Sequence, residues 1–173
     1  MLLLSFVKTI LIPLDLSSDT LALVNYAVPI AAQTNATLLL LHVIRKQPYD
    51  NGTFDPKTEV HQRVKQEAEI ILDQLSRQTF GRGVRSKVLV QDGNPAQTIV
   101  QCARNQHADL IVMRRACDHE NCASEEVLRT ASCPVLTWME TPQNAPSFPD
   151  VPSRKPAARF LRFDEKLSAA PIA

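Results

Sequence analysis

The chain has 173 residues, enough for one ordinary domain and a tail, and its 45% apolar and 21% charged content is typical of a soluble globular protein. Its 19 basic and 18 acidic side chains leave a formal net charge of +1, and it contains one Trp and two Tyr. This balance excludes a strong electrostatic attraction to nucleic acid or to a membrane surface, and it argues against an aromatic platform for stacked bases.

The apolar opening, Met1 to Phe6, lacks the preceding basic residues of a secretory signal, and Lys8 interrupts it early. No apolar stretch approaches the roughly 20 residues of a membrane span. We interpret the opening as the lead-in to a buried strand and expect a cytoplasmic protein.

The first predicted unit is a strand followed by a helix. Ile10 to Leu14 is a short apolar run that ends at Asp15, and Ser17, Ser18 and Asp19 follow as good helix caps. Apolar residues then recur at helical spacing, at Leu21, Val24, Val28 and Ala31. Pro29 lies within this helix and is expected to bend or weaken it.

The second unit repeats the order strand, helix. Thr37 to Ile44 is almost entirely apolar, as expected for a parallel strand covered on both faces. The helix after it is predicted to bury Val60, Val64, Ala68, Ile71 and Leu75 and to end at Gly81 and Gly83. Val84 to Val90 alternates and is less apolar, so this third strand is expected near a sheet edge.

The last elements complete the alternation. Asp92 to Pro95 is predicted as a turn in which Asn94 caps a helix and Pro95 takes its first position. A fourth strand is predicted at 109–113, a short helix capped by Ser124, and a fifth strand at 133–138. The order βαβαβαβαβ predicts an α/β fold: an open, Rossmann-like five-stranded parallel sheet with helices on both faces. A binding crevice is expected beyond the carboxyl ends of the strands, where strand order reverses.

Residues 140–173 differ from this domain, which we place at residues 1–139. Six prolines punctuate them, which predicts an extended, flexible tail. Within the tail, Phe160 and Phe163 offer two interpretations: docking on the domain or a partner, or incidental aromatics.

Cys117, His119 and Cys122 lie close together, but the paired ligand spacing of a structural zinc site is missing. We therefore interpret this cluster as a polar surface loop and predict no metal site.

Five blocks in order resemble the universal stress protein family: ILIPLDLS at 10–17, TLLLLHVI at 37–44, VQDGNPAQTIVQCA at 90–103, HADLIVM at 107–113 and SCPVLTW at 132–138. The likeness covers roughly residues 7–139. It implies the family's adenine nucleotide alpha hydrolase-like version of the Rossmann-like fold, and a homodimer joined through the fifth strand, Val135 to Met139. An unpaired apolar edge strand is consistent with such pairing.

Family members that bind ATP carry glycines behind the fourth strand, where backbone amides approach phosphate. This chain has Arg114 and Cys117 at the first two glycine positions and Asn121 and Cys122 in the region of the last pair, and no glycine follows Asn94. The familiar phosphate cradle is therefore predicted to be absent.

Parts of the pocket match the family's pattern. The resemblance implies that Asp15 faces the adenine and ribose region and that the backbone of Val43 meets adenine. From the residues alone, Asp15 is equally well an exposed carboxylate bound to the following turn, and Val43 plain core. Arg114 and Arg115 either bind an anion through their side chains or are solvated arginines balanced by Glu120, Glu125 and Glu126.

Two functions follow. The first is a non-catalytic stress-response and regulatory protein that acts through dimerisation and an unidentified protein partner, without a cofactor and with ATP binding weak or lost. The second is an ATP- or AMP-binding switch with Arg114 and Arg115 on the phosphates and Asp15 on the ribose. An enzyme is not expected, because the sequence holds no nucleophile elbow, Walker loop or zinc-protease motif and its four histidines lie in different elements.

Overall fold

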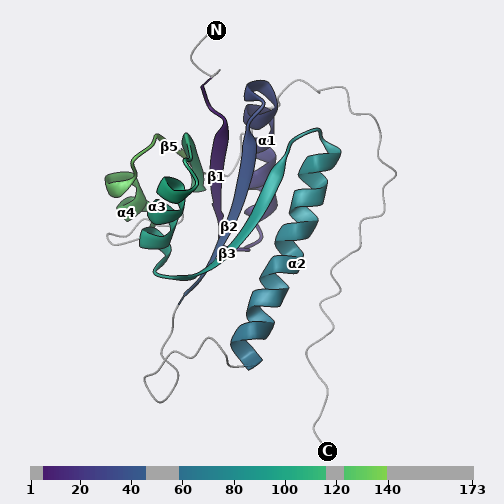
Figure 1. Ribbon diagram of the computed structural model, residues 1–173, viewed down its shortest axis with the longest axis vertical. Coiled ribbons are helices and arrows are strands. Elements are labelled where there is room, and N and C mark those ends of the chain that lie inside the picture. The colour runs from purple at the N-terminus through teal and green to yellow at the C-terminus, as the bar shows by residue number, and fades with distance from the viewer. Residues whose placement is uncertain (1–5, 46–58, 116–122, 140–173) are drawn as a thin grey trace, which may run out of the picture. The chain divides into compact units, whose positions relative to one another are not determined.

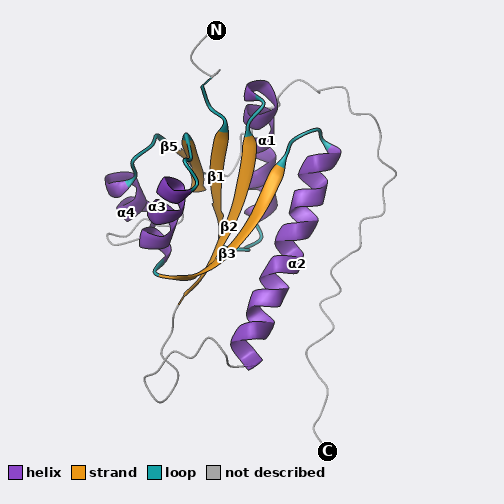
Figure 2. Ribbon diagram, viewed as in Figure 1, coloured by secondary structure: helices purple, strands orange, loops and turns teal. Residues whose placement is uncertain are grey.

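The computed structural model describes residues 6–45, 59–115 and 123–139. The predicted tail at 140–173 and the cluster of Cys117, His119 and Cys122 lie outside the described residues, so both interpretations stay predictions. The elements are β1 (Thr9–Leu14), α1 (Thr20–Thr34), β2 (Thr37–Arg45), α2 (Glu59–Gly81), β3 (Ser86–Gly93), α3 (Pro95–Asn105), β4 (Leu110–Arg114), α4 (Ala123–Thr130) and β5 (Val135–Trp138). This alternation confirms the predicted order (Figure 2).

The five strands form one sheet in the order β3-β2-β1-β4-β5, and every neighbouring pair is parallel. The chain winds outward from β1 through β2 to β3, then crosses back to β4 and continues to β5. The predicted edge position of β3 is confirmed, and β5 forms the other edge. The winding reverses between β1 and β4, which is where a doubly wound sheet opens a crevice.

Helices cover both faces of the sheet, with α1 and α2 on one side and α3 and α4 on the other (Figure 1). The alternation of side chains along β1 supplies both cores. Ile10 and Ile12 face α1 and α2, whereas Leu11 faces α3 and α4, and all three are fully buried. Because both faces of the central strands are buried, their sequences are nearly continuous apolar runs. In the part of the chain that the structure describes, no helix is long and apolar enough to cross a bilayer.

The predicted inner faces of α1 and α2 are partly wrong. Leu21 is exposed, and α1 instead buries Leu23. On α2, three of the predicted core residues are exposed: Val60, Val64 and Ile71. The buried stripe of α2 is His61, Ala68, Leu72, Leu75 and Thr79. Ala68 and Leu75 are therefore buried as predicted, whereas His61, Leu72 and Thr79 take the other inward positions, because packing against the sheet, rather than residue type, selects the inward face.

The local sequence signals within and at the ends of three helices have different outcomes. α1 runs unbroken from Thr20 to Thr34 although Pro29 lies within it, so the proline does not end the helix. Ser124 is the second residue of α4 and not the residue before it, so it does not take the predicted N-cap position. At α3 the prediction is confirmed, because the side chain of Asn94 accepts a hydrogen bond from the main-chain N–H of Gln97 at 3.2 Å and Pro95 takes the first position.

β3 continues to Gly93, three residues beyond the predicted end of the third strand at Val90. Residues 91–93, which the sequence assigned largely to a turn, continue β3 and pair with Val43, Ile44 and Arg45 at the end of β2. The main-chain pairing offered by the long β2 overrides the local turn preference of Asp92 and Gly93. Gly93 sits close to α3: a Cβ placed on it would collide with the Thr98 hydroxyl oxygen.

This packing yields a prediction about Gly93→Ala. The substitution adds the collision with Thr98 to a backbone conformation, φ +159°, that side chains rarely adopt. We expect it to lower the free energy of unfolding by about 1–3 kcal/mol in urea denaturation. The double variant with Thr98→Ala should recover part of that loss. Gly81→Ala is the matched control, since its Cβ meets nothing within 4 Å and should leave stability unchanged or slightly raised. Equal effects at the two glycines would contradict the prediction.

Candidate ligand-binding cleft

A cleft of about 460 Å³ lies at the carboxyl ends of β1, β2 and β4, where the winding reverses. The starts of α1, α3 and α4 complete its walls. Many of its lining side chains are apolar, among them Pro13, Leu23, Leu41, Val43, Ile99 and Met113. This volume falls in the range of small-molecule sites, and the position is the one at which open α/β sheets bind ligands.

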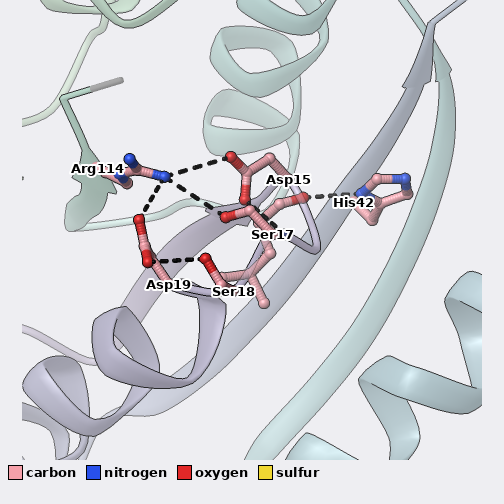
Figure 3. Close-up of polar contacts among 7 residues, drawn as sticks. Asp15, Ser17, Ser18, Asp19, His42 and Arg114 are labelled. Carbon is pink, nitrogen blue, oxygen red and sulfur yellow. Dashed lines mark hydrogen bonds and ion pairs between the residues drawn. The ribbon is translucent and has the colours of Figure 1, made fainter. Parts of the chain in front are cut away.

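The polar end of the cleft is organised around Arg114, the last residue of β4 (Figure 3). Its Nη1 lies 2.7 Å from Oδ2 of Asp19 and 4.0 Å from Oδ2 of Asp15. The same nitrogen donates a long hydrogen bond of 3.5 Å to Oγ of Ser17. Arg114 therefore connects the end of β4 to the turn between β1 and α1.

That turn is held by its own short polar contacts. The main-chain N–H of Ser17 donates to Oδ1 of Asp15 at 3.0 Å, and the hydroxyl of Ser18 donates to Oδ1 of Asp19 at 3.0 Å. Asp19 occupies the N-cap position of α1 but makes no side-chain capping hydrogen bond. Both of its oxygens instead accept from Ser18 and Arg114, so the ion pair replaces the usual cap.

Next to this ion pair lies a buried hydroxyl that lacks a partner. Thr20 opens α1, lines the cleft and is 8% exposed, and within the described residues its Oγ1 makes no hydrogen bond. A buried hydroxyl without a partner is energetically unfavourable. Thr20 is therefore the one lining side chain for which the described structure leaves a hydrogen-bonding need open.

β2 contributes His42, Val43 and Arg45 to the lining. Nδ1 of His42 lies 2.8 Å from the carbonyl oxygen of Leu14, and because a carbonyl only accepts, this nitrogen carries the proton and donates. His42 is thus used to tie β2 to β1. Val43 is half-buried and packs against the core on the α3 side.

The formal charges of the described side chains that line the cleft cancel. Asp15 and Asp19 bear two negative charges, and Arg45 and Arg114 bear two positive ones. Burial by itself would raise the pKa of Asp15, but hydrogen bonds from Ser17 and the Arg114 guanidinium together outweigh it, so this pKa lies below its ordinary value of 3.8. Asp15 is therefore ionised at neutral pH.

The structure brings three of the four sequence-predicted site residues, Asp15, Val43 and Arg114, to the same cleft. Arg115 is not among the lining residues; it is exposed, and its main-chain N–H donates to the carbonyl oxygen of Trp138 at 3.0 Å, extending the β4–β5 ladder. As the sequence allowed, Asp15 is an exposed carboxylate bound to the following turn, but it also faces Arg114.

Asp19 is the residue that sequence reasoning missed, because it was taken only as a helix cap. The ion partners of Arg114 in the described residues are Asp15 and Asp19, not the glutamates of α4. The signal was present in the topology. Once β1 and β4 are neighbours, the residues after the end of β1 must lie beside the end of β4.

A second unpredicted pair lies outside the cleft. Nε2 of the buried His61, on α2, is 3.0 Å from Oδ1 of Asp92, near the end of β3. Neither side chain lines the cleft. In the described part of the chain, no group of three or more His, Cys, Asp and Glu residues could hold a metal ion.

Comparison with known proteins points to one family. The model described as "Universal stress protein family" matches residues 7–137. A universal stress protein of Methanocaldococcus jannaschii is 28% identical over 136 residues, which cover 75% of this chain and 80% of the relative. The solved UspA of Lactobacillus plantarum is 25% identical with a TM-score of 0.65, covering 75% of this chain and 96% of that one. A structure from Archaeoglobus fulgidus in complex with dAMP shares the fold at 18% identity and a TM-score of 0.58, covering 75% and 96% of the two chains.

The lowered pKa of Asp15 predicts a specific dependence of stability on pH. Because the unfolded carboxyl takes up its proton at higher pH than the folded one, its stabilising contribution is complete above the unfolded pKa and is lost as pH falls through the folded value. In urea denaturation, the stability difference between wild type and Asp15→Asn should shrink steadily from about pH 5 to about pH 3. Added salt should reduce it at neutral pH, since the carboxylate is 58% exposed. A difference that is independent of pH would contradict this account.

Proposed function

The chain belongs to the universal stress protein family, and we propose that it is a non-catalytic, cytoplasmic regulatory protein of the stress response in which ATP binding is weak or lost. It acts through a homodimer and contacts with another protein. The observation that carries this proposal is the ion pair between Arg114 and Asp19, which neutralises the cation at the polar end of the cleft.

The sequence around the cleft supports weak ATP binding. The last glycine of the chain is Gly93, so no residue after β4 combines freedom from a Cβ with easy access to left-handed backbone angles. Main-chain amides that approach phosphate closely depend on both properties. Among the residues that the structure describes, the lining side chains do not compensate, since their formal charges sum to zero. A triphosphate would therefore enter a cleft whose described side chains carry no net charge and include two carboxylates.

One observation favours a nucleotide-binding switch as the second candidate. Asp15 and Val43 line a cleft of sufficient size, and the related Archaeoglobus fulgidus protein was solved with dAMP. In this alternative Arg114 leaves Asp19 and contacts phosphate.

The two candidates are separated by titration with a fluorescent ATP analogue. We expect no saturable signal at micromolar concentration, because the cleft offers the phosphates no net positive charge. Saturable binding that Asp15→Ala abolishes would contradict the proposal and favour the switch. Asp73→Ala is the control, since Asp73 pairs with Arg77 on the exposed face of α2 and does not line the cleft.

The proposed dimer uses the fifth strand, Val135 to Met139. β5 pairs with β4 on one side only and is an edge of the sheet, and Met139 is 56% exposed. The carbonyl oxygens of Pro134 and Trp138 face β4. They accept hydrogen bonds from the main-chain N–H groups of Ile111, within β4, and Arg115, directly after it. Because main-chain groups alternate along a strand, Thr137 presents its N–H to the open edge.

This geometry predicts the effect of Thr137→Pro. Removing the outward N–H should convert a dimer to a monomer in size-exclusion chromatography with light scattering, while the β4–β5 ladder keeps its hydrogen bonds. Thr137→Val keeps the N–H and should remain a dimer. Circular dichroism checks that both variants fold. A monomeric wild type at micromolar concentration, or a folded dimeric Thr137→Pro, would overturn the proposed interface.

A further inference from the structure

We infer that Asp19 is a built-in competitor for anionic ligands at Arg114, so that the cleft selects uncharged, ring-bearing ligands of nucleoside size over their phosphate esters. The inference extends the proposed function from what the cleft binds weakly to the class of ligand that it accepts.

The ion pair between Arg114 and Asp19 is short and partly buried. Nη1 of Arg114 and Oδ2 of Asp19 are 2.7 Å apart, the distance of a charge-assisted hydrogen bond. Asp19 is 21% exposed and Arg114 34% exposed, so water screens this contact less than it would a pair on the open surface. The guanidinium is therefore already occupied by an anion that belongs to the chain.

An anionic ligand would meet two carboxylates at Arg114. To reach Arg114, a phosphate must either displace the carboxylate of Asp19 or sit beside it. In both positions it also approaches Asp15, whose Oδ2 is 4.0 Å from the same guanidinium nitrogen. Arg114 and the two aspartates together carry a net charge of −1, so these three side chains disfavour an anion beside the guanidinium. Arg45, the other lining cation, is an exposed residue at the end of β2, and water and salt screen its attraction.

The third step concerns what the cleft still offers an uncharged ligand. Its apolar walls and its volume of about 460 Å³ suit a ring system. Asp15, being ionised and largely exposed, is an acceptor for ligand hydroxyl groups. None of these contacts requires Arg114 to leave Asp19.

Isothermal titration calorimetry on the full chain tests the inference with adenosine, AMP and ATP, which differ only in their phosphates. The wild type should bind adenosine at least as tightly as AMP and more tightly than ATP. Asp19→Asn keeps the shape of the side chain but frees the guanidinium, so it should lower the Kd for AMP relative to adenosine by about tenfold. Adding Arg114→Gln to Asp19→Asn should remove this gain. Asp73→Asn, which breaks an ion pair of 2.8 Å away from the cleft, should leave the ratio unchanged.

The outcomes separate this inference from the proposed function. If adenosine binds and Asp19→Asn leaves the AMP-to-adenosine ratio unchanged, the competitor role of Asp19 is overturned and the proposed function stands. If none of the three compounds binds, the inference fails while weak ATP binding is upheld. If the wild type binds ATP more tightly than adenosine, both fail. Adenosine binding by Asp19→Asn also shows that the variant retains a folded cleft.

Discussion

β1 pairs with β2 on one side and with β4 on the other, and its alternating side chains enter the two cores above and below the sheet. This central position leaves the strand no exposed surface except at its ends. Because the helices that follow β1 and β3 lie on opposite faces, no helix covers the carboxyl ends of β1 and β4. The cleft exists as a consequence of that winding, and its described charged groups come from strand ends and from the turn that follows β1.

The ion pair between Arg114 and Asp19 joins the two halves of this winding. Arg114 is the last residue of β4, the first strand of the second half. Asp19 is the N-cap residue of α1, the helix that follows β1 in the first half. Because the carboxylate of Asp19 binds Arg114, it does not cap the N-terminus of α1, and it connects α1 to β4 instead. A partly exposed pair of this kind contributes little to folding stability on average. Its greater effect is on the electrostatic potential of the cleft, because it cancels a cation where a ligand would enter.

Strands were predictable from sequence where burial on both faces forces a continuous apolar run, as in β1 and β2. The inward face of α2 was not, because Val60, Val64 and Ile71 carry the right residue types on the side that the sheet does not contact. The end of β3 was missed because Gly93 signals a turn locally, whereas pairing with Arg45 keeps it in the strand. The position of Asp15 and Arg114 at the cleft was expected from the family resemblance, but their ion pair depends on side-chain directions that residue spacing does not encode.

The cleft keeps its apolar walls although the sequence behind β4 lacks the glycines of ATP-binding relatives. Arg114, which ends β4, is held at 2.7 Å by Asp19, the N-cap residue of α1. Under the proposed function, the absence of glycines behind β4 weakens the main-chain attraction for phosphate, and the carboxylate of Asp19 beside Arg114 adds repulsion. The two changes act in the same direction on charged ligands and leave the apolar contacts available to neutral ones. If the proposed function holds, charge rather than shape is the property by which this cleft disfavours a triphosphate.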